Sequence, residues 1–343
     1  MEKNRMDEEL FIKSKEKTFV SFLNDLDLNK LPKLDSDDKY KAVLLGFPLD
    51  EGTRIIGGRS GAERGPVVFR DCLKSTELYP FEKIDKISVY DAGNVCNILT
   101  ELELTMEKAH QRLEERVTQI LKNDAKTVPF VIGGSNDQSY PNAKGLLNTL
   151  QPNQKIALIN IDSHFDVRDL IDGRAHSGSP FRLVLEDETF QKSNSKLVEF
   201  ANQGSQCSVD HFEYLKKNKA DVYWLDKDIR RSPKDNKKTD VWTQAGTVMA
   251  SILDSLSAEY DAIFFSFDVD SISSAYCPGV SSPSVVGGLT DEEAAELVYL
   301  AGKCSKVRLV DMSEFNPAVE KKRTGVLLVH LFYHFCRGLA DRG

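Results

Sequence analysis

The chain has 343 residues, of which 41% are apolar and 29% are charged. These fractions exclude a disordered, collagen-like or low-complexity protein. The 53 acidic side chains outnumber the 45 lysines and arginines and give a formal net charge of −8, which argues against nucleic acid as the main partner. No apolar run approaches the roughly 20 residues of a membrane span, so we expect no membrane partner.

The cysteines form no CxxC pair, and their spacing is typical of reduced thiols rather than of a disulfide framework or a zinc-thiolate site. The first nine residues lack the apolar stretch of a secretory signal. Both features lead us to expect a cytoplasmic location. The six cysteines are Cys72, Cys96, Cys207, Cys277, Cys304 and Cys336.

The chain divides into a predicted N-terminal helical extension, residues 1–40, and a single α/β domain, residues 41–343. The extension has weak helical spacing of apolar residues and no strand pattern. In the domain, several apolar runs are continuous, which is typical of strands covered on both faces. The predicted strands span residues 42–46, 86–90, 128–132, 156–161, 221–225, 262–267 and 307–310.

Helical segments lie between these strands. One helix is predicted to begin at Thr100, with Glu103 completing a capping box, and another at Thr290, followed by three acidic residues that suit a helix N-terminus. Alternating strands and helices indicate right-handed βαβ units. The sequence therefore predicts a three-layer α/β/α fold with a mostly parallel central sheet.

Polar residues follow three of the predicted strands at the point where each strand ends. Residues two apart in an extended backbone project to the same side, and ligands of α/β sheets bind at the carboxyl ends of the strands. These positions are therefore candidates for a site. The three segments read Ile161-Asp162-Ser163-His164-Phe165-Asp166, Ser266-Phe267-Asp268-Val269-Asp270 and Ile132-Gly133-Gly134-Ser135-Asn136-Asp137.

Carboxylates gathered at one sheet edge repel one another, and divalent cations relieve that repulsion. An aspartate-rich set with one histidine favours Mn²⁺ over Zn²⁺, with Mg²⁺ as the competitor. A single Asp-x-Asp after a strand is more often a turn or a helix cap. The Asp-x-His-x-Asp and Asp-x-Asp patterns together favour metal binding, and shared carboxylates could bridge two ions.

Four motifs in this order resemble the ureohydrolases, the family of arginase, agmatinase and formimidoylglutamase. The resemblance extends from Gly46 to about Pro317 and implies the arginase-like form of the α/β/α fold. Ser177-Gly178-Ser179-Pro180-Phe181-Arg182 and Cys277-Pro278-Gly279-Val280-Ser281 are most similar to the formimidoylglutamase branch. The four motifs are Gly133-Gly134-Ser135-Asn136-Asp137, Asp162-Ser163-His164-Phe165-Asp166, Ser266-Phe267-Asp268-Val269-Asp270 and Glu314-Phe315-Asn316-Pro317.

The resemblance implies a binuclear Mn²⁺ centre. One departure concerns Asn136, because the family usually has histidine there, and an amide oxygen is a poorer donor than imidazole. We therefore expect a weak first site that fills only at high Mn²⁺. The implied ligands are Asp162 and Asp268, which bridge the ions, Asp166 and Asn136 at the first site, and His164 and Asp270 at the second.

The resemblance also implies three catalytic residues. Glu314 would hold the amidinium group of the substrate through a charge-assisted pair, and a salt bridge at the strand end is its alternative. His176 would deliver a proton to the leaving amine, and a solvated loop histidine is its alternative. Asp166 would steady the tetrahedral intermediate.

The implied reaction converts N-formimidoyl-L-glutamate and water to L-glutamate and formamide, a step of histidine breakdown. The small-molecule substrate is an amidine on a dicarboxylate, so the pocket needs cations. A guanidinium group matches a carboxylate bidentately, and we expect at least one nearby arginine to bind a substrate carboxylate. The candidates are Arg168, Arg182, Arg54 and Arg59.

Three questions stay open. Arginase or agmatinase activity is the nearest alternative, and a catalytically silent homologue with a weakened metal site is another, which Asn136 favours. Cys277 is either a redox-sensitive thiol beside the site or a packed loop thiol. Relatives in this family form trimers, hexamers and other assemblies, so a homo-oligomer is an expectation whose size the sequence does not specify.

Overall fold

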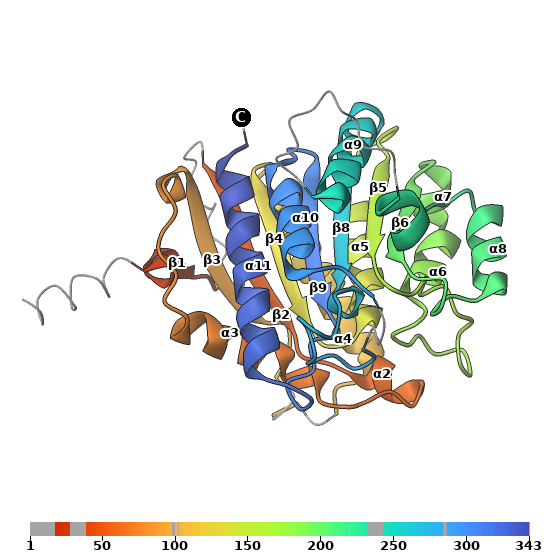
Figure 1. Ribbon diagram of the computed structural model, residues 1–343, viewed down its shortest axis with the longest axis horizontal. Helices are drawn as coiled ribbons and strands as arrows, with labels where there is room; N and C mark the ends of the chain where they lie inside the picture. The colour runs from red at the N-terminus through yellow and green to blue at the C-terminus, as the bar shows by residue number, and fades with distance from the viewer. Residues whose placement is uncertain are drawn as a thin grey trace, which may run out of the picture.

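The computed structural model describes residues 18–27, 39–97, 100–101, 103–231, 243–283 and 287–342. Nine strands of these residues form one sheet in the order β1-β3-β2-β4-β9-β8-β5-β6-β7 (Figure 1). Every neighbouring pair is parallel, as predicted. The strands are β1 (Leu23–Asp25), β2 (Tyr40–Phe47), β3 (Ile87–Asn94), β4 (Thr127–Gly133), β5 (Ile156–Ile161), β6 (Lys196–Asn202), β7 (Asp221–Trp224), β8 (Ala262–Asp268) and β9 (Val307–Ser313).

Helices cover both faces of the sheet and bury two separate apolar cores. Alternate strand residues enter opposite cores, so Phe265 of β8 belongs to the core that includes residues of α3, α9, α10 and α11, whereas Phe264 belongs to the core that includes residues of α4–α8. Figure 1 shows α10 and α11 in front of the sheet. The predicted three-layer fold is confirmed. The helices are α2 (Glu51–Ile55), α3 (Gly65–Ser75), α4 (Met106–Asn123), α5 (Ser139–Leu147), α6 (Pro180–Glu186), α7 (Glu188–Lys192), α8 (Val209–Lys217), α9 (Gln244–Glu259), α10 (Asp291–Lys303) and α11 (Lys322–Ala340).

Strand β9 has a particular place in this sheet. It is the last strand in sequence among the described residues, yet it lies between β4 and β8 near the middle of the sheet. β1, β3, β2 and β4 form one side, and β8, β5, β6 and β7 form the other. Among the described strands, the two sides are joined by pairing only through β9.

The N-terminal segment differs from the predicted helical extension. Residues 1–17 and 28–38 lie outside the described residues, and residues 18–27 contain a short 3₁₀-helix, Phe19–Phe22, and then β1. The prediction of no strand in residues 1–40 is therefore wrong, because Leu23–Asp25 pairs with β3. A run of three residues is too short to show an alternating pattern. The domain boundary at residue 41 stays a prediction.

Two other elements also differ from the prediction. Helix α4 begins at Met106, not Thr100, and Thr105 is its N-cap, while Glu101 accepts a backbone hydrogen bond in the preceding turn. Strand β6 was not predicted, because Glu199 interrupts its apolar run. The predicted start of α10 at Thr290 is confirmed, with a full capping box. None of the helices in the described ranges is long and apolar enough to cross a bilayer.

Candidate metal centre

The carboxyl ends of four central strands meet at one edge of the sheet. β4, β9, β8 and β5 are adjacent and parallel, so the residues at their ends become neighbours. Asn136 lies in a 3₁₀ turn after β4, Glu314 follows β9, Asp268 ends β8 and Asp162 follows β5. The sequence analysis expected Asn136, Asp162 and Asp268 at this edge from the strand ends, and it assigned Glu314 to the site through the family resemblance.

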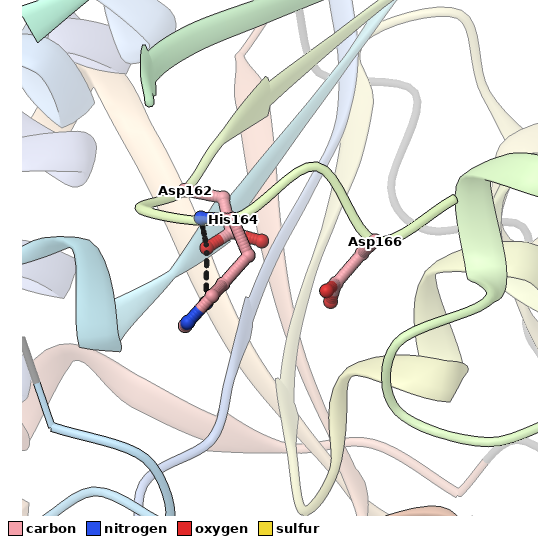
Figure 2. A group of neighbouring side chains, drawn as sticks. All are labelled: Asp162, His164 and Asp166. Carbon is pink, nitrogen blue, oxygen red and sulfur yellow. Dashed lines mark hydrogen bonds and ion pairs between the residues drawn. The ribbon is translucent and has the colours of Figure 1, made fainter. Parts of the chain in front are cut away.

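The aspartates and the histidine of this edge form two overlapping groups. Asp162, His164 and Asp166 make one group (Figure 2), and Asp162, Asp268 and Asp270 make the other. Within each group, the potential ligand atoms all lie within 4.8 Å of one another. Asp162 belongs to both groups, which is the arrangement that a bridging carboxylate requires.

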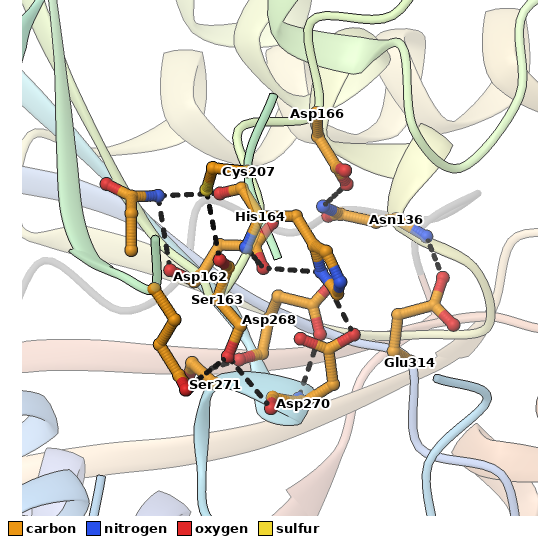
Figure 3. A network of polar contacts seen from close by, with 12 residues as sticks. Asn136, Asp162, Ser163, His164, Asp166, Cys207, Asp268, Asp270, Ser271 and Glu314 are labelled. Carbon is orange, nitrogen blue, oxygen red and sulfur yellow. Dashed lines mark hydrogen bonds and ion pairs between the residues drawn. The ribbon is translucent and has the colours of Figure 1, made fainter. Parts of the chain in front are cut away.

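Hydrogen bonds within the loops fix some oxygens and leave others free for a ligand (Figure 3). Asp162 Oδ1 accepts from the backbone N–H of His164 at 2.8 Å, and Asp268 Oδ1 accepts from that of Asp270 at 2.9 Å. His164 Nδ1 lies 3.3 Å from Asp162 Oδ1 and 3.5 Å from Asp270 Oδ2. Asp162 Oδ2 and Asp270 Oδ1 are buried and accept no hydrogen bond from the described residues.

The charges of this cluster are unfavourable without a cation. Burial, followed by the charge of Asp162, raises the pKa of Asp166 to about 8. Burial and the neighbouring carboxylates also raise the pKa of Asp268 well above its usual range. Burial alone would lower the pKa of His164, but the charges of Asp270 and Asp162 raise it to about 12. Positive charge is thus strongly favoured at this point of the molecule.

The residues present fit divalent metal ions. Unpaired buried carboxylate oxygens are costly unless a donor or a cation meets them, and the two buried oxygens of Asp162 and Asp270 have neither. The donor set is dominated by carboxylate oxygen with one imidazole, which suits Mn²⁺ or Mg²⁺ better than thiolate-preferring metals.

Asn136 is brought to the cluster next to Asp166. Its Nδ2 donates to Asp166 Oδ2 at 2.8 Å (Figure 3), and its Oδ1 accepts from the hydroxyls of Ser139 and Ser313, each at 2.9 Å. Its backbone N–H donates to Glu314 Oε1 at 2.8 Å. Asn136 therefore connects the predicted metal ligand Asp166 with the predicted amidinium-binding carboxylate.

Two of these residues have a strained backbone. Asp166 and Glu314 have φ values of 47° and 68°, in the left-handed region that residues other than glycine rarely adopt. Such conformations cost about 1–3 kcal/mol each and gather at functional sites. Since both carboxylates line one cavity, the strain is consistent with a functional placement of the two side chains.

A cavity of about 340 Å³ opens beside the cluster, a size that suits a small molecule. Thr53, Ser177, Gly178, Ser281 and Ser282 line it although the sequence analysis did not assign them a role. Ser177, Gly178 and Ser281 belong to motifs quoted from the sequence, whereas Thr53 lies in α2 and had no such signal. The cavity is lined by Thr53, Ile56, Gly57, Gly58, Arg59, His164, Asp166, Arg168, Ser177, Gly178, Asp268, Asp270, Ser281, Ser282 and Glu314.

Two of the four predicted arginines line the cavity, Arg59 and Arg168. The guanidinium of Arg59 donates to the carbonyl oxygens of residues 280 and 281. Arg168 is exposed, and its stem passes Gly178, where an added Cβ would lie 2.8 Å from Arg168 Cδ. Arg54 pairs with Asp50 instead.

Arg182 also lies outside the cavity lining. Its Nε donates to the backbone carbonyls of residues 167 and 168, its other nitrogens pair with Asp169 and Glu186, and the guanidinium stacks on Tyr214 at 4.2 Å. These contacts assign Arg182 to holding the loop that carries Arg168.

The structure does not bring His176 into the cavity lining. The side chain is buried, Nε2 lies 2.9 Å from the carbonyl oxygen of Asp169, and Nδ1 accepts from the backbone N–H of Gly178 at 3.1 Å. Both ring nitrogens are thus engaged with the backbone. Ser177 and Gly178, the next two residues, line the cavity instead.

Cys277 is fully buried, and burial raises the pKa of its thiol. A reactive cysteine needs exposure and a lowered pKa. Of the two interpretations from the sequence, the packed loop thiol therefore agrees better with the geometry.

Buried carboxylates and one imidazole at the carboxyl edge of a parallel sheet define a metal-binding α/β/α protein. The family model of the arginase family matches residues 40–337, and the chain belongs to the arginase family. This finding agrees with the resemblance stated from the motifs.

The chain is also similar to individual proteins named as formimidoylglutamases. A formimidoylglutamase of Staphylococcus aureus is 28% identical over 310 residues, which cover 90% of this chain and 89% of that protein. The solved structure of Trypanosoma cruzi formiminoglutamase with Mn²⁺ is 38% identical, with a TM-score of 0.76, and covers 93% of this chain and 100% of that chain. The formimidoylglutamase of Bacillus subtilis, 24% identical with a TM-score of 0.76, supports the fold.

Proposed function

We propose that the protein is a manganese-dependent formimidoylglutamase. It hydrolyses N-formimidoyl-L-glutamate to L-glutamate and formamide, a step of histidine breakdown. The relatives named above support the activity. The observation that carries the proposal is the cavity wall, where metal-ligand carboxylates, the buried Glu314 and the exposed Arg168 surround one space.

The cluster would hold two Mn²⁺ ions. Asp162 and Asp268 would be the shared ligands, as the family resemblance implies, and Asp162 belongs to both groups of neighbouring ligand atoms. When bound, the two ions supply a water molecule activated as a nucleophile and neutralise negative charge that develops during its attack. The remaining ligands are Asp166 and Asn136 at the first site and His164 and Asp270 at the second.

Glu314 orients the amidinium group. The residue is 4% exposed, and its carboxylate accepts from the backbone N–H of Asn136 at 2.8 Å and from the Thr53 hydroxyl at 3.4 Å. Burial, followed by the charge of Asp270, raises the pKa of Glu314 to about 8. A cationic amidinium beside it restores the ionised form, because opposite charges favour each other in a buried site.

Arg168 binds a carboxylate of the substrate. Its guanidinium makes no side-chain ion pair that is seen among the described residues, whereas Arg54 and Arg182 are engaged elsewhere and Arg59 holds two backbone carbonyls. A dicarboxylate amidine needs such a cation. Agmatine carries no carboxylate, so Arg168 favours formimidoylglutamate.

The leaving glutamate nitrogen needs a proton when the C–N bond breaks. Asp166 lines the cavity, whereas both ring nitrogens of His176 are bonded to the backbone. We therefore assign the proton transfer to Asp166. His176 shapes the loop that places Ser177 and Gly178 at the cavity wall.

Glutamate release from N-formimidoyl-L-glutamate, measured while Mn²⁺ is titrated under reducing conditions, tests this function. We expect release that rises with Mn²⁺ and far exceeds hydrolysis of arginine or agmatine. Faster hydrolysis of arginine or agmatine would instead assign arginase or agmatinase activity. Inertness toward all three amidines at every Mn²⁺ concentration would assign a catalytically silent homologue.

We also propose a cytoplasmic location, supported by the six free cysteines, which are typical of reduced compartments. A homo-oligomer remains part of the proposal because the family includes several assemblies. Sedimentation of the purified chain measures its size directly.

A further inference from the structure

A row of buried polar side chains lies deeper in the sheet than the metal centre, two residues earlier along the strands. The register places Asn160 of β5 beside Ser266 of β8, and Ser266 beside Asp311 of β9. Residues two apart on a strand face the same side, so Ser266 and Asp311 lie directly below Asp268 and Ser313. All five side chains are buried.

Ser139, the first residue of α5, joins this row to the metal centre. Its Oγ lies 2.9 Å from Asn136 Oδ1, 3.0 Å from Asp311 Oδ2 and 3.1 Å from Ser266 Oγ. A hydroxyl has one hydrogen to donate, and an ionised carboxylate is the strongest acceptor of the three. Burial raises the pKa of Asp311 to about 6, which leaves it ionised at neutral pH. The hydrogen of Ser139 therefore goes to Asp311.

The amide of Asn136 has two orientations of nearly the same shape. In the first, Nδ2 donates to Asp166, and Oδ1 accepts from Ser139 and Ser313. In the second, Oδ1 faces Asp166, and Nδ2 donates to the two serine oxygens. An amide NH₂ group is a donor only, so only the second orientation presents a ligand to a cation at Asp166.

We propose that Asp311 is a positioning residue for the metal centre. By taking the hydrogen of Ser139, it leaves the Ser139 oxygen free to accept from Asn136 Nδ2. The carbonyl oxygen of Asn136 is then held toward the first metal site. Asp311 thus supports the asparagine that stands where the family usually has histidine. The inference rests on the two-ion Mn²⁺ centre of the proposed function.

A Mn²⁺ titration followed by electron paramagnetic resonance tests this inference without any activity measurement. The readout is the Mn²⁺ concentration at which the spin-coupled signal of a two-ion centre appears. We expect Asp311→Asn and Ser139→Ala each to raise it about 10-fold, as is typical for residues that orient a metal ligand. The double variant should need no more Mn²⁺ than Ser139→Ala alone, because without the Ser139 hydroxyl the residue at position 311 has no contact through which to orient Asn136.

Asn142→Ala is the matched control. Asn142 Nδ2 donates to the same Asp311 oxygen at 2.7 Å, but the charge of Asp311 and its bond to Ser139 remain in the variant. We expect Mn²⁺ binding like that of the wild type, together with a lower free energy of unfolding. Weaker Mn²⁺ binding in this control would show that any disturbance of the polar row weakens the centre, and would overturn the specific role of Asp311.

Two further results would overturn the inference. One is a Ser139→Ala variant that binds Mn²⁺ like the wild type. Because this variant removes a single oxygen, it tests the inference even if Asp311→Asn does not fold. The other is an additive loss of about 100-fold in the double variant, the sign of independent effects. A wild type with no two-ion signal at any Mn²⁺ concentration would overturn both this inference and the proposed centre. If the wild type shows the two-ion signal and the variants show it at the same Mn²⁺ concentration, the inference is overturned but the proposed centre is not.

Discussion

Replacement of Arg168 by methionine tests the assignment of the substrate carboxylate. Methionine keeps the length of the stem that passes Gly178 and removes the guanidinium group. Hydrogen bonds to charged groups contribute about 1.5–3 kcal/mol. Arg168 is exposed, so water screens its charge, and the pair of Arg168 with the substrate carboxylate should contribute near the lower end of this range. A loss of about 1.5 kcal/mol corresponds to roughly 10-fold in binding.

The loss should appear mainly in KM. The carboxylate that Arg168 binds is held equally in the ground state and in the transition state, and removal of such uniform binding raises KM with kcat nearly unchanged. Steady-state glutamate release at saturating Mn²⁺ measures both constants. Arg64→Met is the matched control, because Arg64 is also exposed and does not line the cavity; its KM should stay at the wild-type value.

A second substrate sharpens the test. A formimidoyl amine that lacks both carboxylates should react equally slowly with the wild type and with Arg168→Met, since this substrate offers no carboxylate for Arg168 to bind. An equal loss on both substrates would refute the reasoning, because it would place the effect of Arg168 on the cavity as a whole. An unchanged KM for formimidoylglutamate would refute it as well.

Three other predictions follow from the site and its scaffold. Asn136→His should retain more Mn²⁺ after dialysis than the wild type, since imidazole is the better donor; equal metal content by atomic absorption would show that Asn136 does not limit the first site. Glu314→Gln should lower kcat/KM about 100-fold, near the upper limit for a charged hydrogen bond, while two Mn²⁺ still bind; lost Mn²⁺ would instead make Glu314 part of the metal site. Thr290→Ala removes the capping box of α10 and should lower the free energy of unfolding by about 1 kcal/mol in urea titrations, whereas Ser255→Ala within α9 should change it little.

The central strands were predictable because their burial on both faces leaves a continuous apolar run. β6 was missed because Glu199 stands in its middle. Glu199 is fully buried, and its Oε2 accepts from Asn160 Nδ2 of β5 at 2.9 Å. Asn202 of β6 donates to the same oxygen at 3.4 Å, but the shorter bond comes from the neighbouring strand, which a single segment of sequence does not reveal.

The clustering of the predicted metal ligands follows from their spacing after strands, since sheet topology brings strand ends together. The roles of the loop side chains were not. His176 and Ser177 are adjacent in sequence, yet His176 is bonded to the backbone through both ring nitrogens and Ser177 lines the cavity. The direction of a loop side chain depends on local turns, and no periodicity encodes it.

The sequence also did not show which of the four candidate arginines lie at the cavity. Four were equal candidates by residue type, and their partners separated them. Arg182 is held by Asp169 and Glu186, and Arg54 by Asp50, so neither guanidinium is available at the cavity. Two of these pairs have the i,i+4 spacing that the sequence shows, whereas the pair of Arg182 with Asp169 joins distant residues that spacing does not predict.

The position of β9 has a consequence for the order in which the protein folds on the ribosome. A nascent chain that ends before Val307 has both sides of the sheet but lacks the strand that pairs with each of them. Glu314 and the final alignment of β4 with β8 are then missing, so such a chain exposes two long strand edges that invite aggregation. Closure of the sheet must wait for a contact between residues about 180 positions apart, such as Phe130 with Val310, and contacts of such long range slow folding. We therefore expect assembly of the metal centre to be a late step in the maturation of the chain, one that follows the synthesis of β9 and Glu314.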